Sequence, residues 1–109
     1  MLLRAAAIAF ITLSSLSAAV ALDGHPAAQC AFNADKSSLV LTVSNGDDQA
    51  YACSASCQYT VTGARPLQTF SCNYSLGANT GEKTACDLDG SGPGHFNELR
   101  PTRFVCQPR

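Results

Sequence analysis

Hydrophobic and polar positions alternate along most of the chain beyond residue 25. From Tyr51 to Val61, every second residue is apolar, aromatic or cysteine, and the residues between are small or polar. The same alternation recurs, for longer or shorter stretches, over 30–32, 39–44, 70–76, 84–88 and 104–106. A strand with one buried and one solvated face requires this period of two. We therefore predict β-strands over these ranges, with Leu39, Cys57, Cys72 and Phe104 among the inward-facing residues.

Turn-forming residues separate the predicted strands. They cluster at 45–48, 63–66, 77–81 and 89–94, which are rich in Gly, Asn, Asp and Pro. These residues tolerate positive φ or interrupt a ladder, so they end strands and start turns. No window has the i, i+3, i+4 apolar spacing of an amphipathic helix. The pattern predicts an all-β fold, a small antiparallel β-sandwich of immunoglobulin-like architecture that is stabilised by disulfides.

The first 21 residues differ from the rest of the chain. They hold one charged residue, Arg4, before an apolar run over 5–16, and they end in Ala-Val-Ala. A positive start, an apolar middle and a small-x-small end are typical of a secretory signal peptide. We predict cleavage after Ala21, with Ala19 as the alternative, which leaves 22–109 as a single domain without a membrane span. The compartment is then periplasmic or extracellular, depending on a source that the pattern does not identify.

Removing this segment changes the composition of the 109-residue chain. Much of its 46% hydrophobic content belongs to the signal peptide, and the remainder has six basic and eight acidic side chains, a formal charge of −2. This balance argues against a nucleic-acid-binding protein. The basic residues after Glu98 are Arg100, Arg103 and Arg109, which we interpret as solvated charge. The short length limits the chain to one small domain with a thin core.

Six cysteines dominate the candidate chemistry. Those in clear strands share the phase of the predicted buried face; the full set is Cys30, Cys53, Cys57, Cys72, Cys86 and Cys106. Buried cysteines of even number in an exported chain indicate three disulfides. A zinc site is disfavoured, because Cys53-x3-Cys57 has no second close couple of cysteines or histidines. We expect no cofactor.

Strand geometry restricts how these cysteines pair. Cys53 and Cys57 lie four residues apart in one predicted strand, about 13 Å, whereas a disulfide needs Cα atoms within about 7 Å. A hairpin turn at 63–66 would place Cys57 nearly opposite Cys72. The first-choice pairs are therefore Cys57–Cys72, Cys53–Cys86 and Cys30–Cys106, and the alternative is a Cys72–Cys86 bridge.

The acidic segment 87–98 is a candidate site of two kinds. Aligned with the twelve-residue calcium loop, it places oxygen ligands at Asp87, Asp89, Ser91 and Glu98 and a glycine at position six. Proline and glycine occupy positions seven and eight, and no amphipathic helix flanks the segment, so we favour a solvated surface loop. Together with His95, the acidic residues also form a candidate acid–base group. We expect no enzyme, because the chain has no Gly-x-Ser-x-Gly turn and no free cysteine nucleophile.

The outward-facing residues of two predicted strands form an uncharged polar surface. They carry hydroxyl or amide groups and are Ser54, Ser56, Gln58, Thr60 and Thr62 on one strand and Thr69, Ser71, Asn73 and Ser75 on the next. Such a surface can bind a glycan or a partner protein, although one wet face is also ordinary for an antiparallel sheet. Asn73 also begins an Asn-Tyr-Ser sequon, which matters only in a eukaryotic source.

Three functions remain open at this point. The leading one is an exported, non-catalytic binding or structural module with an unidentified protein or glycan partner. The alternative is a secreted effector or inhibitor that presents the disulfide-braced loop 90–94 to a target protein. The third is a small secreted hydrolase that uses the Asp, Glu and His residues of the acidic segment.

Overall fold

A computed structural model describes residues 25–109; the predicted signal peptide lies outside these residues. The strands are β2 (Pro26–Phe32), β3 (Ser38–Asn45), β4 (Tyr51–Val61), β5 (Gln68–Leu76), β6 (Thr80–Asp89), β7 (Phe96–Leu99) and β8 (Arg103–Pro108). No helix occurs in the described range, so none there could cross a membrane. The all-β prediction is confirmed.

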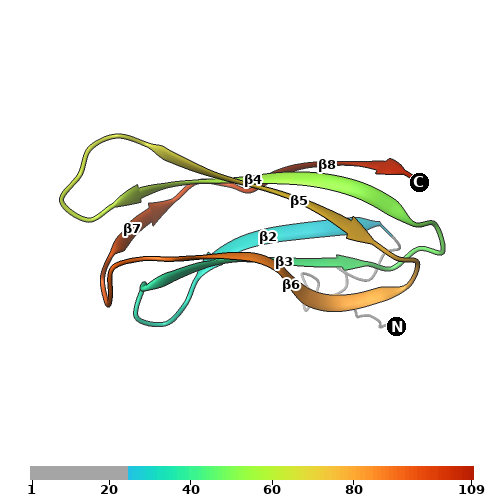
Figure 1. Ribbon diagram of the computed structural model, residues 1–109, viewed down its shortest axis with the longest axis horizontal. Coiled ribbons are helices and arrows are strands. Elements are labelled where there is room, and N and C mark those ends of the chain that lie inside the picture. The colour runs from blue at the N-terminus through green and yellow to red at the C-terminus, as the bar shows by residue number, and fades with distance from the viewer. Residues whose placement is uncertain (1–24) are drawn as a thin grey trace, which may run out of the picture.

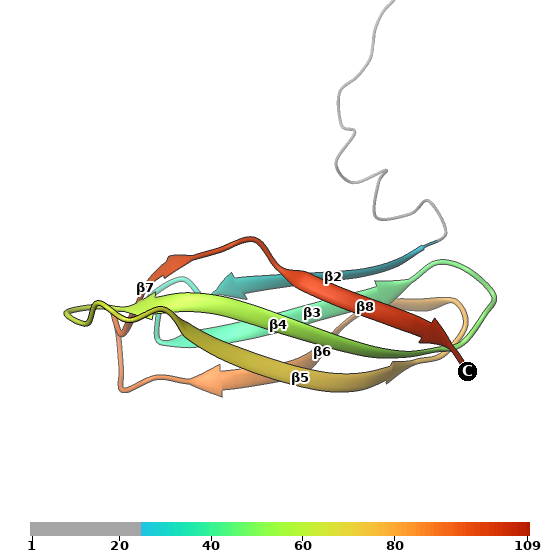
Figure 2. The ribbon, with the colours of Figure 1, turned by 90° about the horizontal axis from the view of Figure 1, so that it is seen from above.

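The strands form two antiparallel sheets packed face to face (Figures 1 and 2). One sheet has the order β2-β3-β6. The other is built around β4, which pairs with β5 along one side and with β7 and β8 along the other. The small antiparallel sandwich is confirmed; its immunoglobulin-like architecture stays a prediction.

The predicted alternation places the core correctly in the central strands. In β3, Leu39, Leu41 and Val43 are buried, and in β4 the run from Cys53 to Tyr59 is buried at every second residue. Phe96 of β7 is 1% exposed and is part of the core. Its ring stacks on Phe32 at 5.3 Å between centroids and meets the edge of Tyr59 at the same distance. Such aromatic pairs add about 0.5–1.5 kcal/mol to the free energy gained from area burial.

Asn45 is the one buried polar residue of the described core, with 0% exposure. Its side-chain amide donates hydrogen bonds to the carbonyl oxygens of Gln49 (2.8 Å) and Gly77 (2.9 Å). Its side-chain oxygen accepts a hydrogen bond from the backbone N–H of Asp47 at 3.2 Å. A buried amide is tolerated only when its groups are paired in this way. Asn45 therefore ties the β3–β4 loop to the β5–β6 turn.

All six cysteines form disulfides, but the first-choice pairs are wrong. Two bridges cross between the sheets: Cys30 of β2 bonds Cys57 of β4, and Cys72 of β5 bonds Cys86 of β6. The third, Cys53–Cys106, joins the neighbouring strands β4 and β8. The Cys72–Cys86 bridge is the pairing that the sequence offered as the alternative, and Cys53 does not bond Cys57.

The register of the β4–β5 hairpin explains the error. Cys57 lies opposite Phe70, and Cys72 lies opposite Ala55, so the two cysteines are offset by two residues. The β4–β5 ladder ends with Tyr59 opposite Gln68, so the hairpin is centred between Gly63 and Ala64, whereas Cys57 opposite Cys72 would need a centre between Ala64 and Arg65. Since the position of the turn sets hairpin register, this displacement of the turn by one residue offsets Cys72 from Cys57 by two. Cys72 then bonds across to the other sheet.

Two further residues, Thr84 and Phe104, were predicted to be buried and are exposed. A register shift between Leu41 and Thr42 inserts Ala85 as an extra residue in β6, so Thr84 pairs with Thr42 and is exposed, out of phase with Cys86. Phe104 does share the inward phase of Cys106, but it is 39% exposed rather than buried. Its strand, β8, lies at the edge of its sheet (Figure 2). An inward side chain there has a neighbouring strand on one side only and is therefore less covered than one on a central strand.

Candidate functional site

The candidate site is the outward surface of the sheet around β4, which we call the outer face. It consists of the side chains that alternate with the buried ones on three adjacent strands: Ala52, Ser54, Ser56 and Gln58 of β4; Thr69, Ser71, Asn73 and Ser75 of β5; and Arg103, Val105 and Gln107 of β8. The sequence predicted the contributions of β4 and β5. It missed β8, whose own alternation of Arg103, Val105 and Gln107 was the available signal.

Register aligns these side chains in rows across the sheet. Ser54 of β4 lies between Asn73 of β5 and Val105 of β8. In the next row, Ser56 lies between Ser71 and Arg103. Neither the β4–β5 nor the β4–β8 pairing contains a register shift, so the rows continue along the strands without interruption. Partners directly opposite have Cβ atoms about 4.5–5.5 Å apart, which makes each row a continuous contact surface.

Two shallow hollows adjoin on this face. One has a volume of about 490 Å³ and is bordered by Ser54, Asn73 and Gln107; the other has about 240 Å³ and is bordered by Ser56, Ser71 and Arg103. Val105 borders both. The central strand carries only alanine and serine at these outward positions, whereas Asn73 of β5 and Arg103, Val105 and Gln107 of β8 are larger. The result is a trough with hydroxyl and amide groups and one exposed valine.

The last two residues of the predicted polar series have structural partners. The Thr60 hydroxyl oxygen accepts a hydrogen bond from the backbone N–H of Glu98 at 3.1 Å. The Thr62 hydroxyl donates to the carbonyl oxygen of Gly94 at 2.7 Å. These threonines hold the segment around β7 against β4. The open part of the outer face therefore ends near Gln58.

The acidic segment is divided between the two sheets. Asp87 and Asp89 belong to β6, where Asp89 accepts a hydrogen bond from the Ser38 hydroxyl at 3.3 Å, whereas Glu98 belongs to β7. Within residues 25–109, no group of three or more His, Cys, Asp or Glu side chains is placed to hold a metal ion. The calcium-loop arrangement of Asp87, Asp89, Ser91 and Glu98 is not formed, because strands occupy both ends of the segment. The same division separates the two aspartates from Glu98 as an acid–base group.

The loop 90–94 is fixed by hydrogen bonds to the β2–β3 turn. The N–H groups of Gly90 and Gly94 donate to the carbonyl oxygens of Ser37 (2.8 Å) and Asp35 (2.7 Å). The Ser91 hydroxyl and His95 Nδ1 share a hydrogen bond of 2.9 Å, a contact that the sequence reasoning missed. The His95 ring lies so close to Gly90 that a Cβ there would be 2.5 Å from it. Glycine at this position therefore leaves the space that the His95 ring occupies against the loop.

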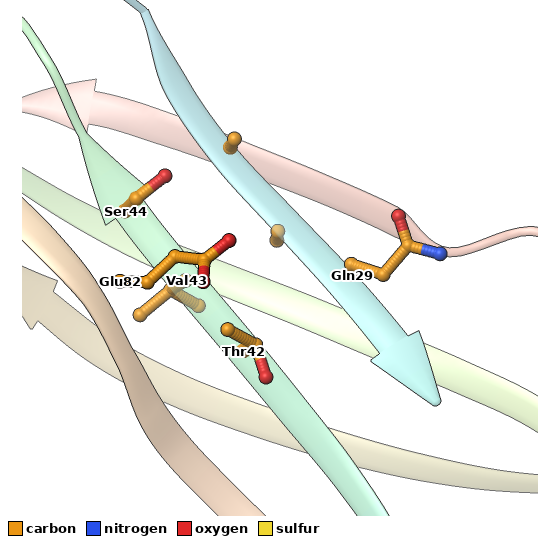
Figure 3. A pocket seen from close by; sticks show the side chains of 7 residues that line it. Gln29, Thr42, Val43, Ser44 and Glu82 are labelled. Atoms are coloured by element: carbon orange, nitrogen blue, oxygen red, sulfur yellow. The ribbon is translucent and has the colours of Figure 1, made fainter. Parts of the chain in front are cut away.

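A third hollow lies on the outward surface of the other sheet (Figure 3). It has a volume of about 330 Å³, and the side chains of Gln29, Thr42, Ser44 and Glu82 gather around it from three strands. β2 also contributes the small residues Ala27 and Ala28 to its lining. Unlike the trough on the outer face, this hollow contains a carboxylate. The two sheets thus present surfaces of different charge.

Shifted pKa values occur at two loop carboxylates, Asp35 and Asp47, and at two strand tyrosines, Tyr51 and Tyr74. The Tyr51 hydroxyl donates a 2.6 Å hydrogen bond to the Asp47 carboxylate, which lowers the pKa of Asp47 and raises that of Tyr51. The pKa of Asp35 is lowered mainly by the hydrogen bond from the Ser37 hydroxyl. Burial raises the pKa of Tyr74, whose hydroxyl is buried. Hydrogen bonds that favour the charged form account for both carboxylate shifts, and these are features of turn structure.

Comparison of this chain with protein-family models, with curated proteins and with solved structures found no match.

Proposed function

We propose that this protein is an exported, non-catalytic interaction module and that its outer face binds a protein or glycan partner. The observation that carries the proposal is the trough on that face, where two hollows adjoin over Ser54 and Ser56. Hydroxyl and amide groups at its border can donate and accept hydrogen bonds, as glycans and polar protein surfaces require. Val105 adds an apolar contact at its centre.

The covalent framework supports a binding role. β4 provides the floor of the trough and is held by two disulfides, through Cys53 to β8 and through Cys57 to β2. A rigid surface loses little conformational entropy on binding, so more of the contact energy is available as affinity. Three disulfides also favour an oxidising compartment, which is consistent with a periplasmic or extracellular module.

The experiment compares two outward substitutions on the central strands of the two sheets. Ser54→Arg fills the trough with a long charged side chain, whereas Thr42→Arg makes the same charge change on the other sheet. Each oxidised protein is immobilised and exposed to native culture medium or envelope extract, and to a glycan array. The proposal expects a ligand that the wild type and Thr42→Arg retain and Ser54→Arg loses. Equal retention by all three proteins, or no ligand for the wild type, would contradict it.

The inhibitor function remains the second candidate because the loop 90–94 is exposed and conformationally fixed. The hydrogen bonds to Ser37 and Asp35 and the Ser91–His95 contact would present it to a target protein in one conformation. Replacing Ser91 and Pro93 together by alanine separates the two functions. An inhibitor would lose its target with this change, whereas an interaction module using the outer face would not.

Catalysis by the acidic segment is the third candidate, and our proposal excludes it. Replacing Asp87, Asp89, His95 and Glu98 tests this directly. A binding module keeps its ligand when these side chains are changed to their amides or, for His95, to glutamine. A hydrolase would lose turnover.

A further inference from the structure

β8 is an edge strand with an exposed surface. It pairs with β4 along one side only, and every residue of the strand except Cys106 is exposed. The edge strand of the other sheet, β2, lies nearby, and its Cys30 N–H donates to the Thr102 hydroxyl oxygen at 2.8 Å. That contact precedes the first residue of β8. Within residues 25–109, no strand pairs with the side of β8 that faces away from β4, and we call this side the open edge of β8 (Figure 2).

The pairing with β4 shows which main-chain groups face this open edge. The Arg109 N–H donates to the Ala50 carbonyl oxygen at 3.0 Å, so odd-numbered residues point their main-chain groups toward β4. The Cys53 and Cys106 Cα atoms are 4.1 Å apart, the short spacing of a pair that exchanges no ladder hydrogen bonds. Main-chain groups alternate in direction along a strand. The N–H and C=O groups of Phe104 and Cys106 therefore point away from β4 to the open edge.

The side chains along this edge are apolar and basic. The large apolar residues that are exposed in the described range are Leu67, Phe104 and Val105, so two of the three lie on β8. Arg103 and Arg109 flank them, six positions or about 20 Å apart, and the sequence has no acidic residue after Glu98. Arg103, Val105 and Arg109 share one phase of the strand. Natural edges are usually protected by bulges, charged side chains or proline. β8 has no bulge along β4, and its charged side chain Arg103 and its Pro108 stand at the two ends of the strand, outside the segment from Phe104 to Cys106.

The other three edges are less suited to accept a strand. β6 is interrupted by two register shifts. β2 is engaged at Cys30 by Thr102. β5 carries no charged side chain and no exposed large apolar residue. β8 alone among these edges combines a regular register, exposed apolar side chains and a charge of one sign.

We propose that the open edge of β8 binds an extended segment of a partner protein by strand addition. The segment has acidic residues in phase with apolar ones, so its carboxylates lie beside Arg103 and Arg109 and its apolar residues lie beside Val105. Main-chain hydrogen bonds to Phe104 and Cys106 provide the general attachment, and the charges select the partner. Arg103 and Val105 also border the trough of the outer face, but the strand addition depends on the main-chain groups of Phe104 and Cys106, so it can fail while the proposed function holds.

The test uses a synthetic seven-residue peptide with blocked ends. It has glutamate at positions one and seven, valine at positions three and five, and threonine at positions two, four and six. This pattern is the same in both strand directions and spans the distance from Arg103 to Arg109. Two controls accompany it: a peptide with lysine in place of glutamate, and the acidic peptide with alternate amides N-methylated. Fluorescence anisotropy measures affinity with the full oxidised chain, and amide hydrogen exchange by NMR locates the site.

The proposal expects the acidic peptide to bind and to slow exchange of the Phe104 and Cys106 amides. Both control peptides should bind at least about tenfold more weakly, since one loses the charge attraction and the other the ladder hydrogen bonds. Equal binding of all three peptides, or binding without protection of those two amides, would overturn the proposal. So would no binding of the acidic peptide.

Two matched pairs of variants sharpen the result. Arg103→Glu should weaken the acidic peptide at least about tenfold, whereas Arg65→Glu, the same change at the β4–β5 loop, should leave its affinity unchanged. Phe104→Pro removes an outward N–H and Phe104→Ala keeps it, so the proline variant should bind the peptide more weakly. Unfolding curves of each pair confirm that both members are folded. Equal effects within each pair would contradict strand addition.

A second copy of this chain is the competing occupant. If the protein without peptide sediments as a dimer that protects the Phe104 and Cys106 amides, and Val105→Lys makes it monomeric, the edge belongs to self-association. That outcome would overturn the proposal of an acidic partner segment. A monomer with unprotected amides, which gain protection only with the acidic peptide, supports it.

Discussion

The two sheets of this small sandwich are built from similar strands but differ in regularity and charge. The sheet around β4 contains four of the six cysteines, pairs without register shifts along β5 and β8, and presents mainly hydroxyl and amide groups. The β2-β3-β6 sheet contains the other two cysteines, has two register shifts in β6, and carries the carboxylates of Glu82, Asp87 and Asp89 on that strand. An irregular strand with several carboxylates resists association, whereas a regular strand with few charges favours it. This difference is why we propose binding at the β4 sheet rather than at the β2-β3-β6 sheet.

Two of the three disulfides join the two sheets and the third joins β4 to β8, and their complete reduction should have the largest effect. Each bridge contributes about 2–4 kcal/mol, so the three together match the whole net stability expected of a small domain. We expect the reduced protein to be unfolded at 37 °C. Circular dichroism melting with and without a reductant checks this, and an unchanged melting transition after verified reduction would disprove it.

Removing one bridge at a time should distinguish contacts between the sheets from contacts within one. The double variant Cys30→Ala/Cys57→Ala loses a bridge between sheets and should lower the free energy of unfolding by about 2–4 kcal/mol throughout the core. The matched variant Cys53→Ala/Cys106→Ala loses the bridge between β4 and β8. Because β8 is an edge strand, its amides should exchange faster than those of β3 in this second variant. If both variants instead accelerated amide exchange equally in all strands, β8 would not open separately from the rest of the sandwich.

Asn45 links the ends of both sheets through the loops that it holds, so its loss should rank next. Asn45→Ala leaves the carbonyl groups of Gln49 and Gly77 without these donors and should cost about 1–3 kcal/mol. Asn73→Ala, an exposed change on the outer face, serves as the control and should cost within about 0.5 kcal/mol. Urea unfolding measures both. Equal costs would mean that the buried hydrogen bonds of Asn45 contribute no more than a surface side chain.

The smallest expected effect concerns the β3–β4 loop, where the chain passes from one sheet to the other. The Tyr51 hydroxyl lowers the pKa of Asp47, so the folded state favours the carboxylate more than the unfolded state does. This stabilisation is present above the unfolded pKa of an aspartate, about 3.9, and is lost as the pH falls through the lower folded pKa. Tyr51→Phe should therefore be less stable than the wild type at pH 7, and the difference should shrink in acid. Chemical unfolding at a series of pH values measures it, and a difference independent of pH would exclude Asp47 as its cause.

Local pattern was sufficient to predict which residues point inward in most strands. Side chains alternate along any extended chain whatever its partner, so Leu39, Cys57 and Leu76 could be placed in the core from the sequence. The same alternation revealed the β4 and β5 parts of the outer face. Phe104 failed this prediction because its exposure depends on the position of β8 at the edge, which alternation does not encode.

Only the tertiary structure decided how the strands and the cysteines pair. The pairing of β8 with β4 and the extra residue Ala85 in β6 depend on contacts between segments far apart in the chain, and the position of the β4–β5 turn depends on how the two strands pack in the sandwich. A shift of two residues in one hairpin preserves every inward position, yet it moves Cys72 from Cys57 to Cys86. The sequence by itself therefore determined the all-β class, the inward phase of the cysteines and the polar character of the outer face. Register and packing decided the disulfide pairs, the trough and the open edge of β8, because these depend on distances across the sandwich rather than along the chain.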